Sequence, residues 1–375
     1  MTSRTASSTV TTTATTGTAT AAAASAGIEF RQVSKRYGGA GSPLVVKGID
    51  LVVPKGSLTT ILGPSGCGKT TTLRMIAGLD SASGGRVLIG GKDVTRLAAS
   101  ERDVSMVFQS YALFPHLNVI DNVAYGLQAG GMRKEPAREQ ARTKLALVGL
   151  SELEVRLPSE LSGGQQQRVA VARALVLEPQ VLLFDEPLSN LDAKLRRKVR
   201  DDIRALQQSL GLTVVYVTHD QSEALAVSDR VIVMSNARIA QIGTPRELYE
   251  RPADRFLADF IGDANLITGQ VVNDRGEQVF VAGTLRLPLH GSNVSGQALF
   301  AVRPQRLTLH RSAPATPHIQ ASLGKSAYLG THLEHNVKTE FGDMLVIDTD
   351  VDRDLLVGET VYVGLDSRAG AVVSA

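Results

Sequence analysis

Gly63-Pro64-Ser65-Gly66-Cys67-Gly68-Lys69-Thr70 is the stretch that decides how the rest of the chain is interpreted. It matches the pattern G-x-x-x-x-G-K-[ST], in which a glycine-rich backbone surrounds a phosphate group. The apolar run from Leu58 to Leu62 predicts a buried strand before it, and residues 71–77 predict a helix after it. A glycine-rich turn that contains a lysine by chance would need neither a strand before it nor a helix after it. The sequence therefore predicts a phosphate-binding loop, called the phosphate loop below.

Two side chains of the phosphate loop have predicted roles. Lys69 is placed to reach the β- and γ-phosphates of a nucleotide, and the Thr70 hydroxyl is placed to bind Mg²⁺. The loop amides and the N-terminus of the following helix favour an anion. Cys67 is the single cysteine, so no internal disulfide is possible and a reducing compartment is expected.

Composition restricts the class of protein. A chain of 375 residues with 43% hydrophobic content has room for one large and one smaller domain. Forty basic and 37 acidic residues leave a net charge of +3. No apolar stretch approaches the ~18 residues that a membrane helix needs. A role in a membrane process would therefore require another chain to supply the span.

The densest basic run, Lys194 to Arg200, is followed by two acids. Arg197 with Asp201 and Lys198 with Asp202 have the i,i+4 spacing of helical ion pairs. Mixed signs at this spacing are typical of a solvated helix face. We therefore expect no nucleic-acid partner here.

The composition and hydrophobic patterning of the sequence predict three regions. Residues 1–27 are almost all Thr, Ala, Ser and Gly, and predict a disordered tail. Residues 28–262 alternate strand and helix patterns, with a helical insertion over about 110–178. Residues 263–375 predict a small all-β barrel with short strands, among them Gln278–Val281, Ala298–Val302, Leu345–Asp348 and Glu359–Val363.

Polar residues follow three predicted strands of the first region. Val181 to Phe184 is a continuous apolar run, typical of a strand buried in a parallel sheet, and it leads into Asp185 and Glu186. The run from Val214 to Val217 ends near His219, and another strand ends at Gln109. Open α/β sheets bind ligands at the carboxyl ends of their strands, so these residues are candidates for one site.

Motifs in a fixed order resemble the ATP-binding subunit of an ABC transporter, and they are Gly63–Thr70, Gln109, Leu161–Gln165, Val181–Glu186 and His219. Leu-Ser-Gly-Gly-Gln at 161–165, the signature segment, is the most specific of them. The resemblance implies an α/β P-loop ATPase with a RecA-like core, an antiparallel β subdomain and a helical subdomain. It also implies ATP and Mg²⁺ as ligands.

The resemblance assigns catalytic and metal-binding roles residue by residue. Asp185 is expected to hold Mg²⁺ together with Thr70. Glu186 is the expected general base for the attacking water, and His219 the residue that senses the γ-phosphate. Gln109 is expected to touch both the metal and the water. A surface carboxylate and a structural histidine are the alternatives for Glu186 and His219.

Further nucleotide contacts are also implied. Tyr37 matches the aromatic residue that stacks on adenine, with core packing as its alternative. Ser162 can cap a helix and leave its glycine amides free for a phosphate. In the family the signature segment serves the nucleotide of a partner copy, so a homodimer is implied. The remaining expected contacts are Pro64, Ser65, Gly66, Cys67, Gly68, Thr71, Gly163, Gly164, Gln165 and Asp192, the last in a loop at 189–192 whose alternative is a plain turn.

The region after the first domain points to bacterial importers. Ala301 to Gln305 resembles the TOBE barrel of such ATPases, and Tyr111 to Leu117 resembles the segment that meets a membrane subunit, with core burial as the alternative. The implied partners are two permease subunits and, indirectly, a periplasmic or lipoprotein solute-binding protein. The implied location is the cytoplasmic face of the inner membrane. Ferric iron, polyamine or phosphonate is the expected solute, with sugar, sulfate or molybdate as alternatives. A non-transport ABC ATPase is the rival class, but residues 71–160 carry no coiled-coil heptads.

Overall fold

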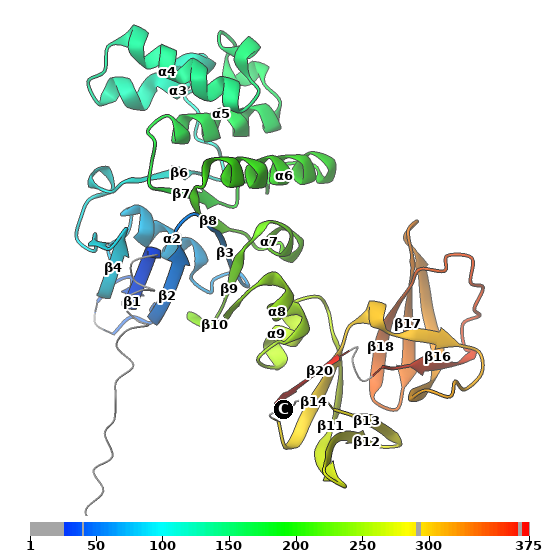
Figure 1. The fold of residues 1–375 in the computed structure, drawn as a ribbon. Helices are drawn as coiled ribbons and strands as arrows, with labels where there is room; N and C mark the ends of the chain where they lie inside the picture. Colours follow the sequence, from blue (N-terminus) through cyan, green and yellow to red (C-terminus); the bar gives the residue numbers. More distant parts are fainter. Residues whose placement is uncertain (1–25, 40, 290–293, 367–369, 375) are drawn as a thin grey trace, which may run out of the picture. The chain divides into compact units, whose positions relative to one another are not determined.

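The computed structural model describes residues 26–39, 41–289, 294–366 and 370–374. The chain forms two compact units, which are described separately (Figure 1). The first unit contains the residues up to 219 together with 236–238, and the second contains 220–235 together with 239–375. Among the described residues, no helix is long and apolar enough to cross a bilayer.

The tail predicted over residues 1–27 lies outside the described residues except at its end. Ala26 and Gly27 are buried and begin the first strand, β1 (Ala26–Arg36). The first strand therefore starts two residues before the expected Ile28. Gly27 is required because a Cβ there would lie 2.6 Å from the Thr213 side chain.

An antiparallel sheet opens the first unit, as the sequence predicts. Its spatial order is β2 (Leu44–Pro54), β1, β4 (Gly84–Ile89) and β5 (Lys92–Asp93). Ile28 and Phe30 of β1 are buried, whereas Glu29 between them is half-buried and Arg31 after them is exposed. This alternation is the pattern of a sheet with one covered face.

A parallel sheet forms the centre of the first unit. Its strands in spatial order are β3 (Leu58–Leu62), β8 (Thr213–Val217), β7 (Val181–Asp185) and β6 (Val104–Val107). All residues of β3 and β8 are buried, which confirms the buried strands read from the continuous apolar runs. Because the pairing is parallel throughout, the carboxyl ends of all these strands meet at one edge.

Helices surround this sheet and extend into a separate helical cluster (Figure 1). α2 (Lys69–Ala77) follows the phosphate loop, and α6 (Ala193–Leu210) joins β7 to β8. The helical cluster has its own apolar core, which includes Val123, Leu145 and Val169. Its elements are α3 (Val119–Ala129), α4 (Lys134–Leu147), η2 (Ser151–Leu153), η3 (Pro158–Glu160) and α5 (Gly163–Leu175), while η1 (Ala99–Glu101) precedes β6.

Two sequence-based expectations about this unit are corrected. Tyr111 is only 5% exposed, so the first residue of the expected aromatic partner surface belongs to the core. On α6, Asp202 pairs with Arg168 of α5 at 2.5 Å and Asp201 pairs with Arg200 at 2.9 Å, in place of the expected Arg197 and Lys198. Tertiary packing brings Arg168 within reach, which no spacing within α6 can indicate.

The second unit contains short helices and an all-β region. Its first elements are α7 (Gln221–Val227), β9 (Arg230–Ser235), β10 (Arg238–Gly243), α8 (Pro245–Glu250) and α9 (Arg255–Phe260). α8 begins with a capping box, in which Thr244 and Glu247 bond to each other's backbone amides. The domain boundary predicted at Gly262 stays a prediction.

Two five-stranded antiparallel sheets make up the all-β region. One has the order β13 (Leu285–Pro288), β12 (Glu277–Ala282), β11 (Asn265–Asp274), β14 (Gly296–Val302) and β20 (Gly370–Ser374). The other has the order β15 (Thr308–His310), β19 (Thr360–Gly364), β16 (His318–Tyr328), β17 (Leu333–Thr339) and β18 (Gly342–Asp348), with η4 (Pro304–Arg306) before β15. The all-β prediction is confirmed.

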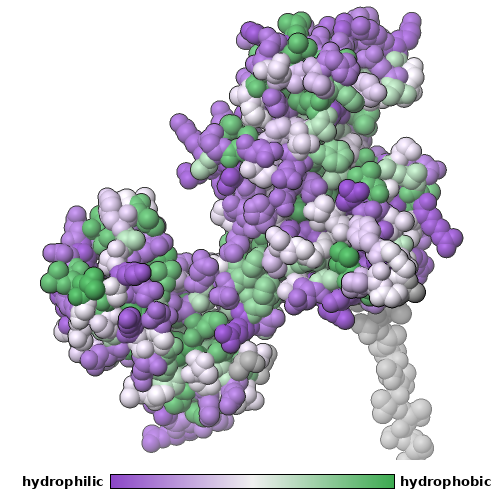
Figure 2. Space-filling model, turned by 180° about the vertical axis from the view of Figure 1, so that it is seen from behind, coloured by the Kyte–Doolittle hydropathy of each residue, from purple (hydrophilic) through white to green (hydrophobic). Residues whose placement is uncertain are grey.

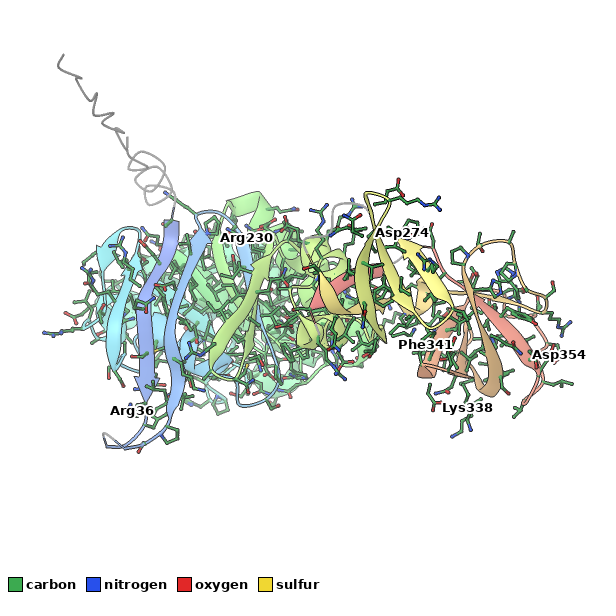
Figure 3. All side chains as sticks on the ribbon, turned by 90° about the horizontal axis from the view of Figure 1, so that it is seen from below. Arg36, Arg230, Asp274, Lys338, Phe341 and Asp354 are labelled. Carbon is green, nitrogen blue, oxygen red and sulfur yellow. The ribbon has the colours of Figure 1, made fainter. Side chains whose placement is uncertain are left out.

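One apolar core joins these two sheets. It includes Phe280 and Phe300 of the first sheet, whose ring centroids are 5.6 Å apart, and Val337 and Val363 of the second. Figure 3 marks the outer positions, with Asp274 at the end of β11 and Lys338 on β17. On the face drawn in Figure 2, apolar side chains reach the surface in scattered groups among polar ones.

Candidate functional site

The phosphate loop forms a cup around the amine of Lys69. Gly66 and Gly68 have φ values of 78° and 104°, which side chains other than glycine rarely adopt. Lys69 is 6% exposed, and its Nζ donates to the carbonyl oxygens of Gly63 at 2.8 Å and Pro64 at 3.1 Å. Gly68 starts α2 without a side-chain cap, so the first amides of the helix remain available to an anion.

Thr70 and Asp185 bring two oxygen donors together beside this cup. The Thr70 Oγ1 lies 3.5 Å from Asp185 Oδ1, although the two residues are 115 positions apart. Burial raises the pKa of Asp185, and the neighbouring Glu186 carboxylate raises it further, while the Thr70 hydroxyl, Arg74 and Lys69 oppose the shift. A half-buried carboxylate beside a hydroxyl suits a hard cation such as Mg²⁺, which prefers oxygen ligands.

Asp185→Asn is expected to stabilise the nucleotide-free protein in EDTA at pH 7. The raised pKa means that the folded state holds the proton more tightly, so stability falls as pH rises above the ordinary value of 3.8 through the folded pKa. Removing the charge should raise the thermal midpoint at pH 7 by about 2–4 °C. The gain should shrink toward pH 4, as measured by calorimetry. A variant less stable than the parent at pH 7 would contradict this account.

Glu186 and His219 meet at the carboxyl ends of neighbouring strands. The His219 Nδ1 is 3.0 Å from Glu186 Oε2, and the Glu186 amide donates to Val217 O at 3.0 Å. Glu186 has φ 45°, an unfavourable conformation for a non-glycine residue that costs about 1–3 kcal/mol. The bond to Val217 holds this strained turn in place. The Glu186 side chain is 22% exposed and that of His219 is 61% exposed, so water reaches both.

Gln109 is held by the loop at 189–192. Its Nε2 donates to Ser189 Oγ at 3.1 Å, and its backbone oxygen accepts from Asn190 Nδ2 at 3.0 Å. The Ser189 hydroxyl donates in turn to the Glu186 carbonyl at 3.0 Å. Gln109 is therefore joined to Glu186 through Ser189, while its expected contact with the metal pair stays a prediction.

Tyr37 lies on the surface near the phosphate loop's helix. It is 48% exposed, so the core-packing alternative is wrong. Its hydroxyl donates to Asp80 Oδ2 at 2.7 Å, and Arg74 Nε binds the same oxygen at 2.8 Å. The amine of Lys35 lies 4.7 Å from the ring centroid. A ring fixed at its edge in this way offers a flat face for stacking.

The signature segment starts α5 with a capping box. Ser162 Oγ accepts from the Gln165 amide at 3.4 Å, and Gln165 Oε1 accepts from the Ser162 amide at 2.8 Å. The predicted cap is confirmed. Asp192 similarly caps α6 by accepting from the Leu195 amide at 2.9 Å. In the part of the chain that the structure describes, no hydrogen bond links the signature segment to the phosphate loop.

Cys67 has no reactive character in this loop. It is 4% exposed, and burial raises the pKa of its thiol, so the neutral form persists.

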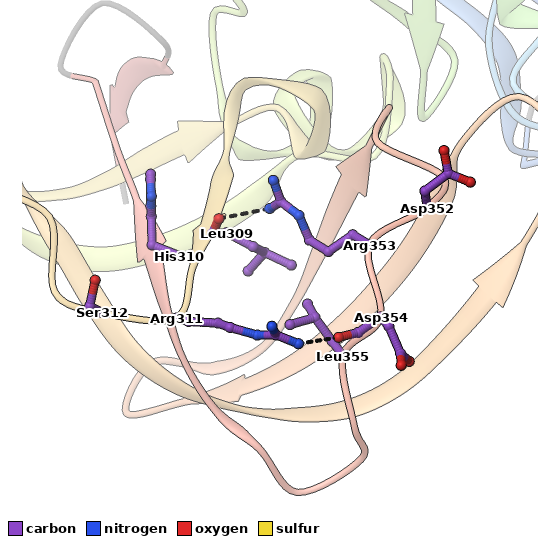
Figure 4. Close-up of a pocket in the computed structure, with 8 residues that line it drawn as sticks. All are labelled: Leu309, His310, Arg311, Ser312, Asp352, Arg353, Asp354 and Leu355. Atoms are coloured by element: carbon purple, nitrogen blue, oxygen red, sulfur yellow. Dashed lines mark hydrogen bonds between the residues drawn. The ribbon is translucent and has the colours of Figure 1, made fainter.

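A separate hollow of about 570 Å³ lies in the all-β region (Figure 4). Its two arginines point toward the protein itself. Arg353 donates to Leu309 O at 2.8 Å and pairs with Asp348, while Arg311 binds the carbonyl of Asp354 and pairs with Glu359. Both guanidinium groups therefore bind other parts of the same region and stabilise its loops.

Sequence reasoning missed two groups near the candidate site. Asp80 holds both Tyr37 and Arg74, and its position just after the helix-ending Gly78 was the available signal. The Ser189 hydroxyl joins Gln109 to Glu186, but the sequence indicated only a loop there. Both roles depend on contacts between residues far apart in the chain.

Comparisons with known proteins agree with these motifs. A family model described as ABC transporter matches residues 46–189, and one described as TOBE domain matches residues 300–373. The chain is 55% identical over 353 residues to "Fe(3+) ions import ATP-binding protein FbpC 1" of Rhizobium meliloti (strain 1021), which covers 92% of this chain and 98% of the relative. It is 48% identical over 320 residues to the Fe(3+) ions import ATP-binding protein FbpC of Escherichia coli O157:H7, covering 85% and 89%.

Solved structures show the same fold in the first part of the chain. The ATP-binding cassette MJ0796, solved as a dimer in a post-hydrolysis state bound to ADP and Pi, is 33% identical with a TM-score of 0.52 and covers 58% of this chain and 99% of its own. The cbiO1 protein of Clostridium perfringens, part of the cbiONQ transporter complex, is 29% identical with a TM-score of 0.55 and covers 60% and 90%. The phosphate loop, the signature segment and the long match to these relatives lead to one conclusion: the chain belongs to the ABC transporter family of ATP-binding proteins and carries a C-terminal TOBE domain.

Proposed function

We propose that this chain is the ATP-hydrolysing subunit of a ferric iron importer. The observation that carries the proposal is the Glu186–His219 pair at 3.0 Å beside the phosphate loop, in a chain 55% identical to a Fe(3+) ions import ATP-binding protein. A phosphate-binding module without catalysis would not need a base at this place. Polyamine and phosphonate importers are the alternative outcomes of the uptake test below.

ATP binding uses the cup and the aromatic face. Lys69 turns from the carbonyls of Gly63 and Pro64 toward the β- and γ-phosphates, where charge-assisted hydrogen bonds are stronger. The uncapped start of α2 supplies amides, and Tyr37 stacks on the adenine. Thr71 follows the phosphate loop directly and lies close enough to the Tyr37 hydroxyl to oppose the rise that burial causes in its pKa, so it connects the two ends of the site.

Thr70 and Asp185 would hold Mg²⁺, with Gln109 as a further contact. When bound, the ion supplies positive charge that offsets the charge on the phosphate oxygens. Few protein ligands suffice because Mg²⁺ keeps several waters and shares the phosphates. This is consistent with the described residues having no cluster of three or more His, Cys, Asp or Glu side chains suited to a metal.

Hydrolysis depends on Glu186 as the general base. The carboxylate takes a proton from the attacking water as the water's oxygen bonds to the γ-phosphorus and the bond to the β–γ bridging oxygen breaks. His219 orients that carboxylate and reaches the γ-phosphate side of the site. The hydrogen bonds of Ser189 to Gln109 and to the Glu186 carbonyl hold the loop at 189–192 in a fixed position relative to the base.

The signature segment acts on the nucleotide of a second copy of the chain. Ser162 caps α5, and the amides of Gly163 and Gly164 are then directed at a phosphate from a positive helix end. Two ATP molecules would lie between two chains. The dimeric state of the related cassette bound to ADP and Pi supports this arrangement.

We further propose that this chain works in an assembly with membrane subunits. Two permease subunits span the membrane, a solute-binding protein delivers iron, and this chain works at the cytoplasmic face. Residues 28–262 form the nucleotide-binding domain, with the helical subdomain at about 110–178, and residues 263–375 form a dimerisation or regulatory domain.

Uptake of radioactive iron tests the solute. Cells that lack this chain should take up ⁵⁵Fe³⁺ slowly, and restoring the wild-type chain should return the rate, whereas Lys69→Ala should not. Labelled putrescine and a labelled phosphonate serve as matched solutes. Loss of putrescine or phosphonate uptake with iron uptake intact would overturn the iron assignment while keeping the ATPase.

A further inference from the structure

Arg173, near the end of α5, grips the chain just after Gln109. Its Nη1 donates to the carbonyl of Ala112 and its Nη2 to the carbonyl of Tyr111, both at 2.7 Å. The two bonds form a fork, a geometry that a planar guanidinium provides and an amine does not. The residue lies on the same helix that begins with Ser162, so one rigid element carries both the signature segment and this grip.

The gripped residues have strained backbone. Tyr111 has φ 60° and Ala112 has φ 48°, so two consecutive non-glycine residues are in the left-handed region. Such conformations persist where the surroundings hold them, and they cluster at functional sites. The carbonyls that Arg173 binds belong to these same two residues. The fork is therefore placed to hold the strained turn.

The guanidinium of Arg173 receives its hydrogen-bond acceptors from the same turn. Burial lowers the pKa of its guanidinium, although arginine stays charged. Among the described residues, Arg173 interacts with the carbonyls of Tyr111 and Ala112 and with the Phe114 ring. The centroid of this ring is 5.7 Å from the guanidinium carbon. No carboxylate is among these partners. A partly buried charge that is satisfied by backbone carbonyls favours the turn that presents them.

The turn sets the position of Gln109. The Tyr111 amide donates to Phe108 O at 2.9 Å, so Gln109 lies inside a turn whose far end is fixed by Arg173. The Tyr111 ring is buried at the same place. On the other side, Asn122 of α3 holds Phe114 through its backbone amide and carbonyl, at 2.8 and 3.0 Å. A shift of this turn would move the Gln109 side chain away from Ser189.

We propose that Arg173 is a positioning residue for ATP hydrolysis, which ties the location of Gln109 to the helix of the signature segment. The inference rests on the proposed function. Arg173 touches neither nucleotide nor metal; it acts by holding a strained turn. Because Ser162 caps the helix that carries Arg173, a displacement of this helix would displace the turn and Gln109 with it.

Arg173→Met and Arg173→Lys test this role in the full-length protein. Because small misplacements of a catalytic group cost up to about a hundredfold, kcat for ATP should fall by about ten- to a hundredfold. The KM for ATP should change less than about threefold on this account, because the phosphate loop and Tyr37 are untouched. The Mg²⁺ concentration for half-maximal rate should rise. Arg168→Met, on the same helix, removes only a surface ion pair with Asp202 and should leave all three values unchanged.

A second substitution separates positioning from simple loss of structure. Ala112→Gly makes the left-handed conformation easy, so it should recover part of the lost kcat in the Arg173→Met background. Hydrogen exchange at residues 108–112 should be faster in Arg173→Met, and this readout needs no activity. If exchange there matches the wild type, the inference fails even if the wild type proves inactive. If the wild type hydrolyses ATP and Arg173→Met keeps its kcat, the inference also fails, while the proposed function stands.

Discussion

Glu186→Gln is expected to lower the rate of ATP hydrolysis by about 10²–10⁴-fold, the usual contribution of a general base. ATP affinity should be retained, since the phosphate loop does not contain Glu186. Hydrolysis normally ends the ATP-bound state, so the variant should accumulate as a dimer with ATP and Mg²⁺. Steady-state phosphate release and size-exclusion chromatography with light scattering measure the two effects.

The geometry explains why this change should be so specific. Glutamine has nearly the shape of glutamate and can still hydrogen-bond His219, whose Nδ1 is 3.0 Å from Glu186 Oε2. The backbone bond to Val217 does not involve the side chain, so the strained turn should survive. What is lost is a group that accepts a proton from water.

Glu178→Gln provides a matched control for this prediction. Glu178 makes an exposed ion pair with Lys144 and is not among the residues that contact the phosphate loop. Removing its charge should therefore leave the hydrolysis rate unchanged. Normal phosphate release by Glu186→Gln would show that another group acts as the base. A monomeric Glu186→Gln protein at saturating ATP would argue against the sandwiched dimer.

Lys69→Ala should weaken ATP binding by about 10–100-fold or more, because each hydrogen bond to a charged group contributes about 1.5–3 kcal/mol. The amine is 6% exposed and held 2.8 Å from Gly63 O, so it is already inside the cup that a phosphate enters. Without it, the carbonyls of the loop would face the anion with no positive charge between them. Isothermal titration calorimetry measures the change.

Lys55→Ala is the matched control, since Lys55 lies exposed in the turn before β3. It should bind ATP as the wild type does. Circular dichroism should establish that Lys69→Ala keeps its fold. Unchanged ATP affinity in a folded Lys69→Ala protein would remove Lys69 from the site and weaken the case for a functional phosphate loop.

The motif residues were predictable because their roles depend on local geometry. The glycine positions of the phosphate loop, the Ser162 cap and the capping box at Thr244 each follow from a few neighbouring residues. The meeting of Glu186 and His219 was also predictable, since the ends of adjacent parallel strands share one edge of a sheet.

Contacts between segments that are far apart in the sequence were harder to predict. The expectation that Tyr111 is exposed was wrong, because its burial accompanies two left-handed residues and the fork from Arg173. The pairing of Asp202 with Arg168 joins two helices, so i,i+4 spacing could not indicate it. The roles of Asp80 and Ser189 likewise depend on where the chain returns in space.

By itself, the sequence determined the family, the order of the motifs, the phosphate loop and the buried strands, because short patterns of glycine, apolar and polar residues control backbone conformation over a few residues. The tertiary structure alone decided that Thr70 lies 3.5 Å from Asp185, that Ser189 joins Gln109 to Glu186, and that Arg173 holds a strained turn. The physical reason is that these contacts arise when separate elements pack, and packing selects partners that sequence spacing does not encode.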